Sequence, residues 1–192
     1  METALSETHE IRIAGFGGQG VILAGMVIGR AAALFDGKHV TLTQSFGPEA
    51  RGSAANVDLI VSPEPILYPY PTHLDVLVAM SQEACARFVP ELAPQGTLVF
   101  EQDLVSFQSP RPELQAYGVP ATRFAEELGH KFVLNMVLVG FLTGMTGLVT
   151  PEAARKSIAD SVPKGTESLN AAAFVKGFEY ASAQRLAFSP HA

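Results

Sequence analysis

Short apolar runs alternate with longer segments of helical spacing along most of the chain. Apolar and β-branched runs predict strands at residues 10–14, 39–44, 56–61, 74–80, 96–100 and 115–119. Alanine-rich or apolar segments predict helices at residues 21–35, 82–92 and 132–149, and from 170 onward. The run at 74–80 is almost wholly apolar, as is typical of a strand buried on both faces of a parallel sheet. This alternation predicts an α/β fold: a Rossmann-like, doubly wound, mainly parallel sheet with helices on both faces.

Short polar residues mark the predicted helix starts, because their side chains accept hydrogen bonds from the first free amides of a helix. They are Ser81, Thr122, Thr150 with Pro151 behind it, and Asn170. The last predicted helix carries Phe174 and Phe178 on one face.

The length and composition predict one globular domain over residues 1–192, with an ordered core at about 10–187. Hydrophobic residues make up 47% of the chain and charged residues 17%, which is typical of a folded protein and not of a disordered one. The net charge is −6 and there is no run of Lys and Arg, so we expect no nucleic-acid partner. The segment 132–149 scarcely reaches the roughly 20 apolar residues of a membrane span. Residues 1–10 are polar and acidic, so we expect a cytoplasmic protein with no membrane partner.

Metal and redox chemistry have little support in the side chains. Cys85 is the only cysteine, which excludes a disulfide framework and fits a reducing compartment. It also excludes an iron–sulfur cluster held by this chain alone, because such clusters usually need four thiolates. The histidines are scattered, with no pair at the spacing of metal ligands.

A glycine-rich loop, Gly15-Phe16-Gly17-Gly18-Gln19-Gly20, follows the first predicted strand and opens a helix. Gly15, Gly17 and Gly20 have the spacing of a dinucleotide-binding motif, in which glycines permit a tight turn and close approach of a ligand, and the helix start attracts an anion.

A dinucleotide enzyme would also place an acidic residue at the end of the second strand, where it binds the ribose hydroxyls. Asp36 precedes that strand and Glu49 follows it by several residues, so a bound dinucleotide is disfavoured. Two alternatives stay open. The glycines serve only to pack a helix tightly against the sheet, or the loop amides meet another phosphate or a partner chain.

A second loop, residues 44–53, contains Ser45, Gly47 and Arg51. It leaves the carboxyl end of a strand that we expect to lie next to the glycine turn, so both loops should face one crevice. The Arg51 guanidinium is suited to a carboxylate or a phosphate. It can equally pair with Glu49 or with a carboxylate of another chain, and both interpretations stay open.

Together the two loops resemble the gamma subunit or gamma domain of the pyruvate/2-oxoglutarate ferredoxin oxidoreductases. The resemblance rests on the glycine loop and on Ser45-Phe46-Gly47-Pro48-Glu49-Ala50-Arg51-Gly52. It continues through Asp75–Ala79, Asn135–Gly140 and Asn170–Phe174 followed by Gly177. The order and approximate spacing hold from about residue 10 to 180. One departure is Ser53, where the family commonly has a second glycine after the arginine.

The resemblance implies an accessory subunit of a complex that converts a 2-oxoacid, coenzyme A and oxidised ferredoxin to acyl-CoA, carbon dioxide and reduced ferredoxin. It implies alpha and beta partner subunits that hold thiamine diphosphate, magnesium and the iron–sulfur cluster, and no catalytic residue in this chain. A separate gamma chain resembles the 2-oxoglutarate type more than the fused pyruvate type. The candidate binding residues are Gly15, Gly17, Gly18, Gln19, Gly20, Ser45, Gly47 and Arg51. The alternatives are a stand-alone dinucleotide-binding oxidoreductase and a scaffold without a ligand.

Several other residues have both a functional and a structural interpretation. Cys85 lies early in a predicted helix, where the helix dipole can lower a thiol pKa, but packing is favoured. We expect Asn135 to hydrogen-bond a backbone carbonyl rather than a ligand. Asn170 is expected to cap a helix. The stretch Tyr68-Pro69-Tyr70-Pro71 either docks a partner, which we favour, or covers the sheet.

Overall fold

A computed structural model describes residues 8–47, 52–109 and 111–188. The strands are β1 (His9–Phe16), β2 (His39–Phe46), β3 (Ala54–Ser62), β4 (Leu74–Ala79), β5 (Leu92–Glu101) and β6 (Gln115–Val119). The α-helices are α1 (Val21–Arg30), α2 (Gln82–Phe88), α3 (Ala121–Glu127), α4 (Leu134–Thr146), α5 (Pro151–Ser161) and α6 (Glu167–Phe188). Shorter helical turns are η1 (Ala31–Phe35), η2 (Val89–Glu91) and η3 (Lys131–Val133). No helix in these described ranges is long and apolar enough to cross a membrane.

The strands form one six-stranded sheet in the order β2-β3-β1-β4-β5-β6. β1, β4, β5 and β6 pair in parallel, whereas β3 is antiparallel to both β1 and β2. The predicted mainly parallel α/β sheet is therefore confirmed. The expectation that β2 lies next to β1 is wrong, because β2 and β3 form a hairpin and β3 takes the place beside β1.

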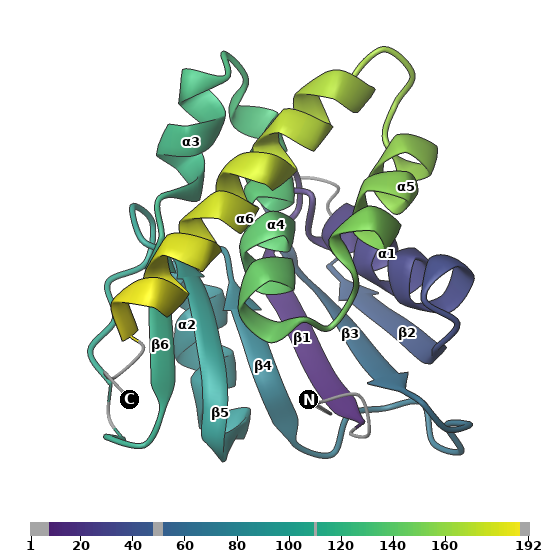
Figure 1. Cartoon of the computed structure of the whole chain (residues 1–192). Coiled ribbons are helices and arrows are strands. Elements are labelled where there is room, and N and C mark those ends of the chain that lie inside the picture. The colour runs from purple at the N-terminus through teal and green to yellow at the C-terminus, as the bar shows by residue number, and fades with distance from the viewer. Residues whose placement is uncertain (1–7, 48–51, 110, 189–192) are drawn as a thin grey trace.

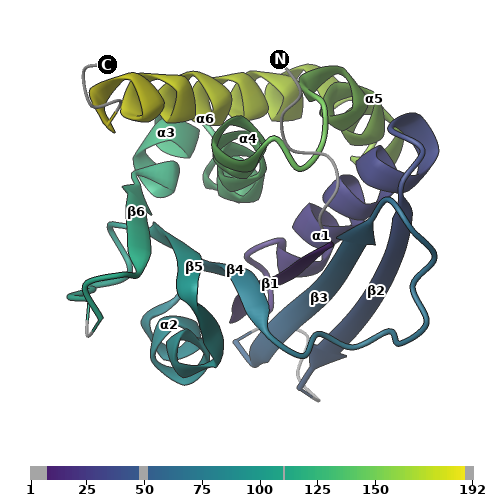
Figure 2. The same cartoon turned by 60° about the horizontal axis from the view of Figure 1, so that its bottom comes forward.

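Helices cover both faces of the sheet, but unequally (Figures 1 and 2). α1, α3, α4, α5 and α6 lie on one face, whereas α2 lies on the other (Figure 2). The main core is on the first face, where Ile11 and Ile13 of β1 are buried against α1 and α4 side chains such as Val27 and Met136. Because alternate residues of a strand point to opposite faces, Ala14 belongs to the smaller core under α2.

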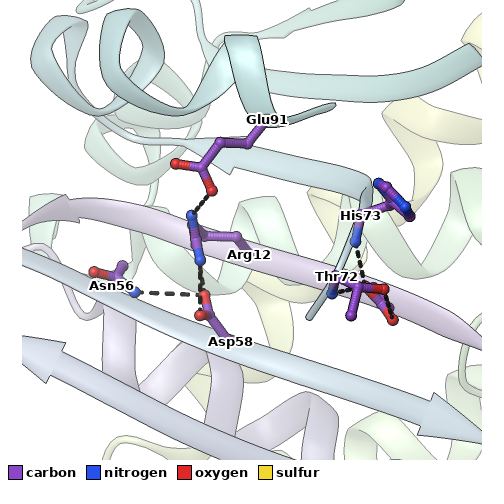
Figure 3. A network of polar contacts seen from close by, with 7 residues as sticks. Arg12, Asn56, Asp58, Thr72, His73 and Glu91 are labelled. Atoms are coloured by element: carbon purple, nitrogen blue, oxygen red, sulfur yellow. Dashed lines mark hydrogen bonds and ion pairs between the residues drawn. The ribbon is translucent and has the colours of Figure 1, made fainter. Parts of the chain in front are cut away.

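A polar network on the α2 side joins three segments (Figure 3). Arg12 of β1 donates to both carboxylate oxygens of Asp58 on β3, at 2.6 and 2.8 Å, and to Glu91 of η2. The Asp58 hydrogen bond raises the pKa of the Arg12 guanidinium, which also lies 4.5 Å from the centre of the Phe88 ring. These contacts use Arg12 to connect β1, β3 and the end of α2.

Two of the predicted helix starts are confirmed. The Ser81 hydroxyl accepts a hydrogen bond from the Ala84 amide, and the Thr150 hydroxyl accepts one from the Ala153 amide. Thr122 is the second residue of α3 and does not cap it, which corrects that prediction.

Asn170 is also not a cap, because α6 begins at Glu167. The Asn170 side-chain amide instead donates back to the Thr166 carbonyl at 2.9 Å and so supports the start of the helix from within its first turns. Phe174 and Phe178 share one face of α6 as predicted, with their rings stacked 6.1 Å apart.

α4 and α6 approach closely, because glycines of each helix face backbone of the other. A Cβ at Gly140 would overlap the Phe174 carbonyl, and one at Gly177 would overlap the Val137 carbonyl. Only glycine on both helices permits this approach, so the pair forms a tight layer over the sheet (Figure 1).

Candidate functional site

The glycine loop joins the carboxyl end of β1 to α1, as predicted. The side chain of Gln19, a residue of the loop, holds it in place. Gln19 Oε1 accepts a hydrogen bond from the Phe16 amide at 2.7 Å, and Gln19 Nε2 donates to the Met80 carbonyl at 2.9 Å. The loop is therefore connected to the end of the neighbouring parallel strand, β4. Gly18 and Gly20 have φ of 99° and 76°, a left-handed conformation that favours glycine.

The turn of the β2–β3 hairpin lies directly against the glycine loop. The Gly17 amide donates to the Ser53 carbonyl at 2.8 Å, and the Gly52 amide donates to the Gly17 carbonyl at 3.3 Å. Gly47 closes the hairpin by donating to the Ala54 carbonyl at 3.1 Å. The expected meeting of the two loops is confirmed, although the antiparallel pairing of β3 produces it.

A pocket of about 690 Å³ opens between these loops and the first turn of α1. Its size is within the range of small-molecule sites. It is lined by Phe16, Gly17, Gly18, Gly20, Val21, Ile22, Leu23, Phe46, Gly47, Ser53 and Ala55. Most of the lining side chains are apolar, and the glycines expose backbone to the pocket. This arrangement suits a ligand with a long apolar part and a polar group.

The start of α1 gives the pocket its electrostatic character. Gly20 occupies the N-cap position without a side chain, and the first turn of α1 contains no acidic residue. Unpaired amides and the helix dipole place partial positive charge at such a start, which favours an anion.

The structure separates the predicted site residues into three groups. Gly17, Gly18, Gly20 and Gly47 line the pocket. Gly15, Gln19 and Ser45 do not line it. Arg51 lies outside the described residues.

Physical reasons explain why three of the predicted residues lie away from the pocket. Gly15 is buried in β1. The side chain of Gln19 is hydrogen-bonded to the backbone of Phe16 and Met80. Ser45 points to the opposite sheet face from its neighbour Phe46, because side chains alternate along β2.

The apolar walls were not among the predicted site residues. Phe46, on the edge strand β2, is 65% exposed although it lines the pocket, and Ile22 faces it from α1. The sequence contained a signal for Phe46, because Leu42, Gln44 and Phe46 are two residues apart and therefore lie on one face of a strand. What the pattern did not show was that this face lies beside the start of α1.

The end of β2 lacks the acidic residue of a dinucleotide site in its described part. Gln44, Ser45 and Phe46 occupy that position. Asp36 is engaged elsewhere, because its carboxylate accepts hydrogen bonds from the Thr150 amide and hydroxyl, both at 2.7 Å. The carboxylate of Asp36 is therefore already used within the protein, in agreement with the expectation that Asp36 is not placed to bind a ribose.

Asn135 and Cys85 have the structural roles that the sequence favoured. Asn135 is buried in the first turn of α4, and its Nδ2 donates to the Gly20 carbonyl at 3.2 Å. Cys85 is buried among apolar side chains, which raises the pKa of its thiol rather than lowering it.

The connection between β3 and β4, residues 63–73, passes beside the edge strand β2 (Figure 2). The Thr41 hydroxyl donates to the Pro69 carbonyl at 3.3 Å, and the rings of Tyr68 and Tyr70 meet edge to face. Both rings are more than half exposed. Docking of a partner on this segment stays a prediction.

Comparison with known proteins places this architecture in a family. Residues 10–180 match the family of pyruvate ferredoxin/flavodoxin oxidoreductases. The chain belongs to this family. It is 47% identical over 174 residues to the 2-oxoglutarate synthase subunit KorC of Methanocaldococcus jannaschii, and the alignment covers 90% of this chain and 93% of that protein.

Solved structures of two ferredoxin oxidoreductases have the same fold. The gamma subunit of a keto/oxoacid ferredoxin oxidoreductase from Geobacter sulfurreducens PCA is 38% identical, with a TM-score of 0.80 over 91% of this chain and 99% of that one. The 2-oxoglutarate:ferredoxin oxidoreductase of Magnetococcus marinus, solved with 2-oxoglutarate, coenzyme A and succinyl-CoA bound, is 26% identical with a TM-score of 0.83. That match covers 93% of this chain but 32% of the Magnetococcus chain.

Proposed function

We propose that the chain is the accessory gamma-type subunit of a 2-oxoacid:ferredoxin oxidoreductase of the 2-oxoglutarate type. It supports the oxidative decarboxylation of the 2-oxoacid with coenzyme A to an acyl-CoA, with reduction of ferredoxin. One observation carries this proposal. The chain corresponds along nearly its whole length to a 2-oxoglutarate synthase subunit and to a gamma subunit, covering 93% and 99% of those proteins.

The need for partner subunits follows from the larger relative. The Magnetococcus chain shares this unit over 32% of its length, so the greater part of that enzyme has no counterpart here. We propose that separate alpha and beta subunits supply it, and that ferredoxin docks on the complex.

The side chains present do not fit thiamine diphosphate with magnesium, or an iron–sulfur cluster. The chain has one cysteine, Cys85 of α2, and its side chain is buried. Across the ranges that the structure describes, no group of three or more His, Cys, Asp or Glu residues is arranged to hold a metal ion. The alpha and beta partners are therefore proposed to hold these groups.

The role proposed for this chain is to bind part of coenzyme A in the pocket between the two loops. Coenzyme A combines anionic phosphates with a long, partly apolar chain. The start of α1 suits the phosphates, and Phe16, Ile22 and Phe46 suit the apolar part. The guanidinium of Arg51, from the same hairpin loop, is proposed to pair with a phosphate.

Affinity purification from the native host tests the proposed function. A tagged chain should bring down larger subunits, and the eluate should reduce ferredoxin when supplied with 2-oxoglutarate and coenzyme A. Reconstitution of the larger subunits without this chain is the control and should lose most of that activity. Elution of the chain alone, or a complex without 2-oxoacid oxidation, would contradict the proposal. Preference for pyruvate would contradict the 2-oxoglutarate type alone.

A further inference from the structure

Two glycines of the loop are surrounded by side chains of the same chain. A Cβ at Gly15 would overlap Gln19 Oε1 and lie 2.9 Å from Met80 Cβ. A Cβ at Gly20 would overlap the side-chain amide of Asn135. The space that these glycines leave open is thus occupied by two carboxamide side chains, one from the loop and one from α4.

Gln19 connects the ends of two parallel strands. Its carbonyl oxygen accepts from the Phe16 amide at the end of β1, and its amino group donates to the Met80 carbonyl just after β4. The Met80 amide in turn donates to the Ala14 carbonyl at 2.8 Å. A carboxamide satisfies one donor and one acceptor at once, which neither a carboxylate nor a thioether of similar length can do.

Asn135 holds the start of α1 from α4. Its Nδ2 donates to the carbonyl of Gly20, the N-cap of α1, while its Oδ1 accepts from the Met136 amide at 3.0 Å. The residue is 2% exposed, and α4 is itself packed closely on α6 through Gly140 and Gly177. The position of the α1 amides beside the pocket is therefore tied to the closely packed α4–α6 pair.

We infer that Gln19 and Asn135 are positioning residues, which hold the glycine loop and the first turn of α1 in the shape that the pocket requires without contacting its ligand. This inference rests on the proposed function, because it assigns the pocket to a reactant of the complex. The loop amides and the pocket walls then carry the ligand contacts. A ligand gains affinity when its site is already ordered.

Gln19→Met and Gln19→Glu test the role of Gln19 in two measurements. In the free chain, Gln19→Met should speed exchange of the Phe16 amide hydrogen about tenfold, because the acceptor is lost. Gln19→Glu should restore its protection, because a carboxylate oxygen still accepts. In the assembled complex, Gln19→Met should raise the KM for coenzyme A several-fold and leave the kcat and the KM for the 2-oxoacid near wild type.

Asn135→Asp tests the second residue independently. It keeps the acceptor for the Met136 amide and removes the donor to Gly20, so the KM for coenzyme A should rise while Phe16 exchange stays unchanged. Gln95→Met, at an exposed glutamine near the beginning of β5, is the matched control and should change neither quantity.

Several results would overturn the inference. Wild-type Phe16 exchange and wild-type KM for coenzyme A in Gln19→Met would remove the positioning role of Gln19. An equal rise in the KM for coenzyme A and the KM for the 2-oxoacid, together with a lower kcat, would indicate general damage to the fold. If Gln19→Met does not fold, Gln19→Glu, which loses only the donor to the Met80 carbonyl, and Asn135→Asp decide by the KM for coenzyme A alone, and a wild-type KM in both would remove the positioning role. Failure of the wild-type chain to assemble would refute the proposed function, whereas the exchange data would still show whether Gln19 holds the loop.

Discussion

The carboxyl group of Glu101 is fully buried at the end of β5. One oxygen accepts from the Thr122 amide at 3.2 Å and the other from the Asp103 amide at 3.1 Å. Pro120, at the N-cap position of α3, makes no side-chain hydrogen bond, so Glu101 supplies an acceptor that this helix start lacks. Burial raises the pKa of Glu101, nearby Asp103 raises it further, and the amide hydrogen bonds oppose the shift.

A raised pKa makes stability depend on pH in a defined direction. The protonated form is favoured in the folded state, so the contribution of Glu101 is fully present below the pKa of the unfolded chain, about 4.5, and is lost as pH rises through the folded pKa. Glu101→Gln has no such proton to lose. The free energy of unfolding of the variant minus that of wild type should therefore increase with pH above about 4.5.

Urea unfolding of both proteins at a series of pH values measures this difference. Glu83→Gln, at an exposed carboxyl in the first turn of α2, is the control and should not show the same rise. If the free energy of unfolding of Glu101→Gln minus that of wild type stays constant or decreases with pH, the pKa of Glu101 is not raised in the folded protein.

Individual contacts were predictable only where one residue had few physical options. A buried Asn in an apolar helix must find a backbone partner, so the role of Asn135 was foreseen correctly. The pairing of Glu101 with α3 was not, because the carboxyl reaches an amide 21 positions away in sequence. The same applies to Gln19, whose second partner, Met80, belongs to another strand.

The contact between α4 and α6 depends on the absence of two methyl groups. Gly140 and Gly177 each face a carbonyl of the opposite helix, and Gly144 faces Ala181. Backbone cannot move aside as a flexible side chain does, so an added Cβ must push the helices apart.

Gly177→Ala should therefore destabilise the protein by about 3 kcal/mol, the upper part of the usual range for overpacking. In a chain of this size the corresponding fall in Tm is about 10 °C. Gly29→Ala in α1 is the matched control, since the nearest atom to its Cβ is a Leu59 methyl group at 3.2 Å.

Alanine favours a helix by about 1 kcal/mol over glycine, so the control should be neutral or slightly stabilising. Thermal unfolding followed by circular dichroism compares the two. A fall in Tm for Gly177→Ala no larger than that of the control would show that the helices separate at little cost.

Elements were largely predictable, because each strand and most helices have their own periodic pattern. Strand β6 was placed correctly at Gln115–Val119. The arrangement of β2 and β3 was missed, although the chain between Phe46 and Ala54 is too short for a parallel crossover, which needs about a dozen residues. Strand order itself was not accessible, because it is determined by packing between distant segments.

For the whole molecule, the pocket lies where the β1–α1 glycine loop, the turn of the β2–β3 hairpin and the first turn of α1 meet. The described lining contains no charged side chain. Arg51 is the basic residue that the sequence places in the loop between Gly47 and Ser53, and it belongs to the proposed site on chemical grounds.

Arg51→Ala in the assembled complex should raise the KM for coenzyme A about tenfold or more, because a hydrogen-bonded charge pair with a phosphate is lost. Arg51→Lys keeps the charge but not the two-point geometry, so its KM should be intermediate. Arg155→Ala, at an exposed arginine of α5, is the control and should match wild type.

Weakened assembly with an unchanged KM would instead assign Arg51 to a carboxylate of a partner subunit. Normal kinetics together with intact assembly would remove Arg51 from the site.

The pairing of β2 with β3 makes the register of the sheet independent of the connection between these two strands. The two strands are paired from His39 and Ser62 up to Phe46 and Ala55, so their register is fixed before the turn begins. Doubling the length of such a connection costs only about 0.6 kcal/mol of closure entropy. The connection between these strands is therefore the part of the chain where insertions and exchanges of sequence can accumulate during evolution while the sheet behind it stays the same.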